Sequence, residues 1–140
     1  MDVTPILARL KAQLTGFAVI AASADADIAI DGAPATPAAY VVPLAETAEG
    51  SALLGLHHQR VTQEFGVVLV LSNLRDATGA AAAADLHAKR MALRAALLGW
   101  VPDASNGEPV SFTAGQLLQF RDQRLWWQDV FRLITDYRSA

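Results

Sequence analysis

The chain of 140 residues contains no cysteine. This excludes a disulfide framework, a thiolate metal site and a cysteine nucleophile, and it is typical of a protein that folds in a reducing interior. Long apolar runs are also missing, since residues 80–84 fall far short of the roughly 20 residues that cross a bilayer. The acid at position 2 and the charges nearby argue against a signal peptide. We therefore expect a soluble, cytoplasmic protein without a membrane partner.

An excess of basic residues is lacking as well. The formal net charge is −3 and the pI is about 5.5, so no general attraction to nucleic acid or to an anionic membrane is expected. The length predicts a single domain, residues 1–140. Apolar residues make up 53% of the chain, but many of them are alanines rather than large core residues. A core with few large apolar side chains favours a protein that packs against partners.

Catalytic motifs are absent. Gly50 and Gly55 have the spacing of a phosphate loop without its Gly-Lys-Ser ending, and no serine lies in a nucleophile elbow. His57, His58 and His87 would suffice in number for a metal site, but adjacent histidines on a strand point to opposite faces. We expect no enzyme, no cofactor and no bound metal.

The C-terminal stretch predicts a β-hairpin. Residues 117–121 and 124–137 are rich in Leu, Phe, Trp, Val and Ile, and Asp122-Gln123 is a polar turn between them. Both faces of the second arm mix apolar and polar groups, with Trp127 and Phe131 on one face and Trp126 on the other. We therefore expect both faces to be covered, one by a helix of the same chain and one by something else.

The rest of the chain predicts further strands and a short helix. Thr4 is expected to cap a helix over residues 4–14, which Gly16 ends. Pro43 places strand 38–45 at an edge or a bulge, because proline lacks the ladder N–H. The other expected elements are strands 17–22, 28–30, 59–72 and 110–112, and polar loops 46–56 and 103–109, the former ordered only when a partner binds.

Residues 80–98 predict a long helix, closed by Gly99, with two apolar faces. At about 100° per residue its leucines form one line, suited to the sheet, and its small residues form a second line, suited to a subunit contact. The first line is Leu86, Leu93 and Leu97, the second is Ala84, Ala88, Met91, Ala95 and Leu98, and His87 and Arg94 lie between them. The expected fold is α+β, with an N-terminal and a central helix on a mostly antiparallel sheet.

The arginines favour ion pairs over a nucleic-acid surface. Arg90 and Arg94 lie one helical turn apart, and acids alternate with the arginines along the strands. Asp129 is one of the available partners. Each exposed pair contributes at most about 1 kcal/mol.

Two segments carry a resemblance to a known family. They are Val-Thr-Gln-Glu-Phe-Gly-Val-Val-Leu at residues 61–69 and Trp-Gln-Asp-Val-Phe-Arg-Leu-Ile-Thr-Asp-Tyr at residues 127–137. With the order of elements, they resemble the tail terminator proteins of long-tailed phages and prophages. The resemblance implies a structural protein that closes into a hexameric ring, caps the tail tube, ends its polymerisation and joins it to the head connector protein.

If the resemblance holds, the partners are copies of the chain itself, the tail tube protein and the head-tail connector, first in the host cytoplasm and then in the virion tail. The candidate ring contacts are Met91, Arg94, Ala95, Leu98 and Trp126, and the candidate docking residues are His57, His58, Asp103 and Asn106. The alternative is a monomeric α+β domain that binds a ligand or catalyses a reaction in a pocket beside the hairpin.

Overall fold

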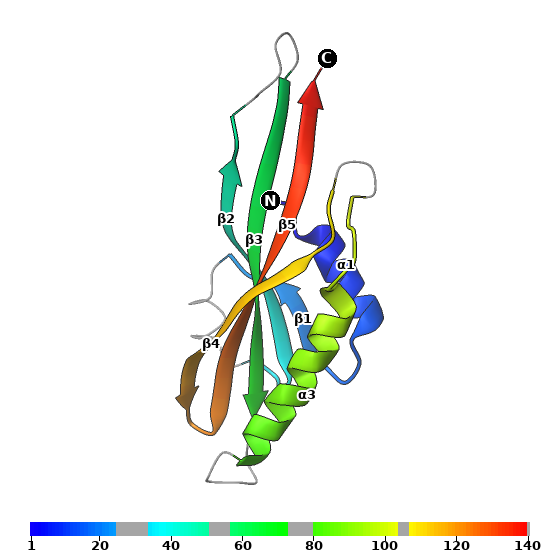
Figure 1. The fold of residues 1–140 in the computed structure, drawn as a ribbon. Coiled ribbons are helices and arrows are strands. Elements are labelled where there is room, and N and C mark those ends of the chain that lie inside the picture. The colour runs from blue at the N-terminus through cyan, green and yellow to red at the C-terminus, as the bar shows by residue number, and fades with distance from the viewer. Residues whose placement is uncertain (25–33, 51–56, 73–79, 104–106, 140) are drawn as a thin grey trace.

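A five-stranded sheet with two helices on one face makes up the computed structural model, which describes residues 1–24, 34–50, 57–72, 80–103 and 107–139 (Figure 1). The elements are α1 (Thr4–Gln13), β1 (Val19–Ala22), β2 (Ala38–Ala48), β3 (His57–Ser72), α3 (Ala80–Leu97), β4 (Ser111–Arg121) and β5 (Arg124–Ser139). The expected α+β fold is confirmed. The extended piece expected at residues 28–30 lies outside the described residues.

The strand order is β1-β2-β3-β5-β4. Only β1 and β2 are parallel. β3 and β5 pair over their full length, from His57 opposite Ser139 to Ser72 opposite Arg124. The turn that joins β4 to β5 is the predicted Asp122-Gln123, with φ of 53° and 59°. Positive φ at both residues is the geometry of a type I′ turn, whose twist matches the strands that it joins.

Both faces of the sheet carry a buried cluster. The main cluster lies between the helices and the face that we call the helix side, and its largest members are Phe65, Phe131, Leu10, Leu69 and Leu93. The opposite face, the far side, holds a smaller cluster of Ala38, Val42, Val68, Val70 and Trp126. Residues 67–71 of β3 are therefore buried on both faces, as their continuous apolar run predicts.

α1 differs from its prediction by one residue at the start. Val3 is the N-cap and Thr4 is the first helical residue. Hydrogen bonding by the Thr4 side chain, and then by the Thr4 N–H at 3.0 Å, holds the pKa of the Asp2 carboxylate below its usual value. Ile6 and Leu10 of α1 are buried against the sheet.

β2 and β4 are longer than predicted. β2 continues to Ala48, and its residues 46–48 pair with β3. The prediction that a loop begins at Glu46 is therefore wrong for these residues. A register shift between Pro43 and Ala45 confirms the bulge. β4 begins at Ser111, and shifts after Phe112 and Leu117 interrupt its pairing with β5. Such bulges break the two-residue alternation on which strand prediction depends.

One end of the sheet extends beyond the helices as an arm (Figure 1), formed by residues 45–48 of β2, 57–64 of β3 and 132–139 of β5. Gly107 and Glu108, at the end of the expected loop 103–109, run along this arm. Glu108 donates its N–H to the Ile134 carbonyl at 2.9 Å, and its carboxylate pairs with Arg60. The segment therefore covers part of the arm.

Candidate functional site

The long helix has the two faces that its sequence predicts. Leu93 and Leu97 are fully buried against the sheet. On the second line, Met91 is 38% exposed and Leu98 is 42% exposed. We call this second line the α3 flank: Ala84, Ala88, Met91, Ala95 and Leu98, all exposed. In a single subunit the flank is a row of small and apolar side chains facing water, which is available for a contact between subunits.

Arg94, a candidate contact residue beside this flank, is held by an aromatic ring. Its guanidinium lies 4.2 Å from the centroid of the Phe112 ring, and its Nε is buried without a hydrogen-bond partner. A cation over a ring face is attracted by the ring's quadrupole. Arg94 therefore connects α3 to the start of β4.

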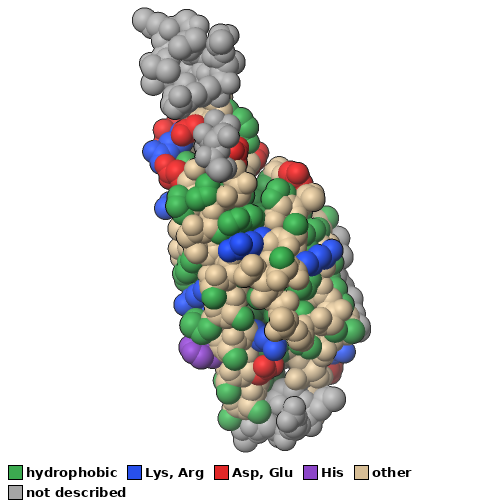
Figure 2. All heavy atoms as spheres, turned by 90° about the vertical axis from the view of Figure 1, so that its right-hand side faces the viewer, with side chains coloured by type: hydrophobic (Ala, Val, Ile, Leu, Met, Phe, Trp, Pro, Cys, Tyr) green, Lys and Arg blue, Asp and Glu red, His purple; other side chains and the backbone are tan. Residues whose placement is uncertain are grey.

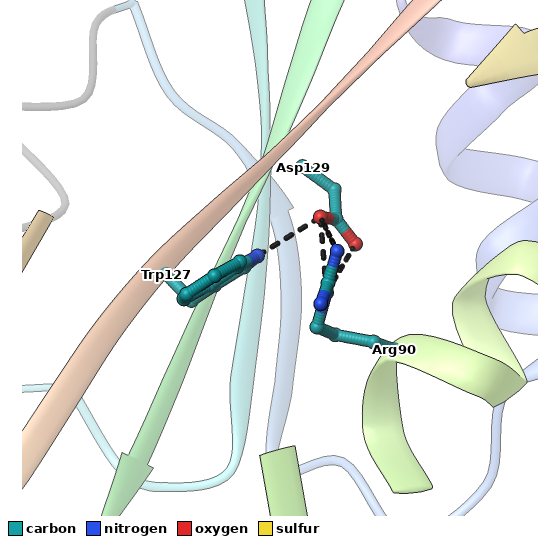
Figure 3. A network of polar contacts seen from close by, with 3 residues as sticks. All are labelled: Arg90, Trp127 and Asp129. Atoms are coloured by element: carbon teal, nitrogen blue, oxygen red, sulfur yellow. Dashed lines mark hydrogen bonds and ion pairs between the residues drawn. The ribbon is translucent and has the colours of Figure 1, made fainter. Parts of the chain in front are cut away.

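A buried ion pair joins α3 to β5 one helical turn earlier (Figure 3). The Arg90 Nε lies 3.1 Å and 3.2 Å from the two carboxylate oxygens of Asp129, and its Nη2 lies 3.0 Å from Oδ1. The Trp127 Nε1–H donates to the same Oδ1 at 2.9 Å, and its ring lies 4.5 Å from the Arg90 guanidinium carbon. Asp129 is fully buried, so these donors replace the water that its charge has lost.

Gly115 of β4 makes room for this ion pair. It lies opposite Asp129 across the β4–β5 pairing. A Cβ at position 115 would come within 2.6 Å of the Asp129 Oδ1 and 2.8 Å of the Arg90 Nη2. Every other residue type would collide with the carboxylate or displace the arginine. The sequence offers Arg90 and Asp129 as partners, but it gives no sign that the pair is buried or that Gly115 accommodates it.

Trp126 occupies a different place from the one predicted. Its ring is only 3% exposed, because it packs in the far-side cluster against Val70 and Ala38. It therefore offers little surface to a neighbouring subunit, and we leave it out of the contacts proposed below. The pattern placed Trp126 correctly on the face opposite Trp127, but alternation alone does not reveal that the chain covers that face itself.

The docking residues lie at the arm. His57 and His58 begin β3, opposite the last residues of β5. Asp103 accepts a hydrogen bond from the Gly107 N–H at 2.7 Å through its carbonyl oxygen, and Gly107 bridges to Thr135 of β5. Asn106 lies outside the described residues. The structure thus brings the two predicted docking segments to the same end of the sheet, although they are 46 residues apart from His57 to Asp103.

The described residues contain neither a metal-binding cluster nor a membrane-spanning helix. Within the described ranges, His, Asp and Glu side chains form no group of three that could hold a metal ion. No described helix is long and apolar enough to cross a membrane. On the side of the molecule that carries α1 (Figure 2), apolar side chains alternate with single basic ones, so this side has no large area of one charge.

The sequence identifies the class of protein that this geometry fits. A family model described as phage tail terminator protein matches residues 1–139. The chain therefore belongs to the phage tail terminator family, and the resemblance seen in the two strand segments is confirmed. It is a structural protein of a phage-type tail. No curated protein sequence matches the chain significantly.

A solved structure supports the fold. A chain in the virion of a native gene transfer agent particle superposes with a TM-score of 0.51 at 17% sequence identity, over 94% of this chain and 95% of that chain. At this identity the likeness concerns the fold alone. It shows that the five strands and two helices described here form an architecture that occurs in a phage-like particle.

Proposed function

We propose that this protein caps the finished tail tube as a ring of six copies, ends its polymerisation and joins it to the head connector protein. Assembly takes place in the host cytoplasm, and the ring remains in the virion tail. The observation that carries the proposal is the exposed α3 flank on a chain of the terminator family. A subunit that works alone has no use for a row of apolar side chains in water.

In a cyclic ring each subunit places one patch against a different patch of its neighbour. We assign Met91, Ala95 and Leu98 to one such patch, with Arg94 at its border. Small side chains on a helix let a neighbouring backbone approach closely, so packing and apolar burial supply the contact. The α3 flank then becomes buried on assembly, while the leucine line stays within the subunit.

Docking to the tube or the connector is assigned to the arm end. The candidates are His57, His58, Asp103 and Asn106, and the described parts of their two segments both contact the last residues of β5. Because the segments share one end of the sheet, we propose that they bind the same partner rather than opposite sides of the ring. Polar and charged side chains suit a contact that must form only at the end of a finished tube.

The test is Ala95→Glu in tail assembly. A glutamate at the seam would bury an unpaired charge at a cost on the order of 3 kcal/mol, so the ring should be lost and tubes should grow past their normal length without heads. Tail length in electron micrographs and sedimentation of the purified protein are the measurements.

Ala8→Glu is the matched control, since it places the same side chain on an exposed alanine of α1. It should leave tail length and sedimentation unchanged. The assignment of the α3 flank is wrong if Ala95→Glu, folded as judged by circular dichroism, assembles tails of normal length.

The alternative of a monomeric ligand-binding or enzymatic domain has less support. A hollow of about 210 Å³ lies beside β2 and the N-terminus, lined by Met1 and residues 43–46, rather than beside the C-terminal hairpin. Its lining contains one acid, Glu46, which is already bonded to Gln63. A strictly monomeric protein on tails as well as in solution would favour this alternative.

A further inference from the structure

Among the described residues, the sheet has two open edges. No described strand pairs with the outer side of β4, whose other side pairs with β5. On the other edge, β1 pairs with only the first four residues of β2, from Ala38 to Val41. Among the strands that the structure describes, none pairs with the outer side of residues 42–48 of β2. Each open edge presents unpaired N–H and C=O groups that a further strand could use.

The β4 edge is unusually bare for a free edge. Residues 113–117 are all exposed, and Leu117 and Phe120 are each about half exposed, at 50% and 49%. Natural proteins protect long edge strands with charges, prolines, bulges or a covering segment, because such edges otherwise bind other chains. β4 has bulges after Phe112 and Leu117, but it has no proline and only one charged residue, Arg121. This is the composition of an edge that becomes covered.

The open half of β2 has free backbone groups. The Glu49 N–H bonds to the Arg60 carbonyl, so by the alternation of a strand Ala48 and Glu46 direct their backbone groups outward. These outward-facing groups suit an approach of β4.

The hollow beside β2 also lies on the correct face. Met1, in its wall, packs against the main cluster on the helix side. Leu117 lies on the same side of β4, because it pairs with Trp127, which pairs with Leu69 of the main cluster. In a ring every copy presents the same face outward, so Leu117 of one copy and the hollow of the next lie on one side of the combined sheet.

We propose that β4 of one copy pairs with residues 45–48 of β2 in the next copy, so that the sheet continues around the ring and Leu117 enters the hollow. The inference rests on the ring proposed above and assigns its backbone contact. β2 and β4 are antiparallel within one subunit, since β2, β3, β5 and β4 alternate in direction. Rotation about a ring axis along the strands preserves direction, so the new pairing is antiparallel.

The required offset between copies is reasonable for a closed sheet. Within one subunit Gln116 lies level with Val68 of β3, through Gln128, and Ala45 lies level with Glu64. Pairing Gln116 with Ala45 thus needs a shift of 68 − 64 = 4 residues, and pairing it with Thr47, level with Thr62, needs 6. In a closed sheet with about 4.8 Å between strands and a tilt of about 40°, four strands per copy offset one copy from the next by roughly 16 Å along the strands. This offset corresponds to about 5 residues, which lies between the two values.

Paired cysteines test the contact, because the chain has none of its own. The variants are Gln116→Cys combined with Ala45→Cys or with Thr47→Cys. All three side chains are exposed and lie on the far side of the sheet. Within one subunit β3 and β5 separate β2 from β4 by about 14 Å, beyond the roughly 7 Å that a disulfide spans, so every cross-link joins two copies.

The control is Gln116→Cys combined with Ala48→Cys, since residue 48 is exposed and faces the opposite side of the sheet from residues 45 and 47. On tails treated with a mild oxidant, non-reducing gels should show a ladder of cross-linked subunits. At least one of the pairs with Ala45→Cys or Thr47→Cys should give about tenfold more product than the control pair, because disulfide geometry excludes cysteines on opposite faces.

The outcomes separate this inference from the proposed function. If rings are visible on the tails and neither the pair with Ala45→Cys nor the pair with Thr47→Cys exceeds the control pair, the strand pairing is wrong and the capping role stands. If the cross-linked ladder forms but removal of the protein leaves tail length unchanged, the capping role fails and the strand contact stands. If no ring forms on tails at all, both are wrong.

Discussion

The centre and the edges of the sheet differ in how deeply they bury their apolar residues. In β3, residues 67–71 are buried on both faces, whereas in β4, residues 113–117 are all exposed. Leu69 and Leu117 stand at the same level of the sheet, linked through Trp127, yet the first is fully buried and the second is half exposed. The centre therefore holds the subunit together, and the edge retains apolar surface for another chain.

The same division occurs on α3. Its leucine line closes the main cluster, and its small-residue line remains in water. The two exposed regions are held in fixed relation to each other, because Arg90 of α3 pairs with Asp129 of β5 and Arg94 of α3 lies over the ring of Phe112 in β4. Assembly surfaces of this kind are rigid before the partner arrives, which lowers the entropy lost on binding.

Asp129→Ala should give the largest effect in this comparison, because it breaks the link between the centre and the edge. The variant leaves the Arg90 guanidinium next to a buried space without its counter-charge, and loss of one partner of a buried pair costs about 3–5 kcal/mol. Urea unfolding followed by fluorescence measures the free energy of unfolding. The double variant Arg90→Leu with Asp129→Leu is the control.

Because the double variant buries no charge, it should lose less stability than Asp129→Ala. Should the single variant lose under about 1 kcal/mol, the pair would be solvated in the way that surface ion pairs are, and its role in holding α3 to β5 would be wrong.

Leu69→Ala and Leu117→Ala sharpen the comparison at a single level of the sheet. Leu69→Ala should lower the free energy of unfolding by about 2–5 kcal/mol, since it leaves a cavity in the main cluster. Leu117→Ala should change it by less than about 0.5 kcal/mol in the isolated protein, as surface substitutions do. Both values come from denaturant unfolding of the purified variants.

In tail assembly, when the two variants are compared at the same concentration of folded protein, Leu117→Ala should have a larger effect than Leu69→Ala. Leu117→Ala should weaken capping, because the proposed contact loses the side chain that enters the hollow. Equal losses of stability in the two variants would show that β4 belongs to the subunit core.

Much of the fold follows from the sequence. The continuous apolar run at residues 67–71 marks a strand covered on both faces, and the 3.6-residue spacing of Leu86, Leu93 and Leu97 marks the buried line of the long helix. Pro43 marks the bulge because proline lacks a backbone N–H for the ladder, and it lacks this group in any structural context. These features depend on neighbours in the chain.

The features that were missed depend on residues far apart in the chain. Arg90 and Asp129 meet across 39 positions, and Gly115 matters only because β4 lies beside them. Trp126 was assigned to a subunit contact because alternation indicates its face but not the far-side cluster that covers it. The α3 flank was found because a second apolar line is visible within one helix.

Hydrogen exchange of the β4 amides tests most directly whether this edge is completed by another copy. In the free subunit the outward-facing amides of residues 113–117 should exchange rapidly, and in the ring on assembled tails they should become protected together with the outward amides of Glu46 and Ala48. Equal exchange of these amides in the free and the assembled protein would contradict the account.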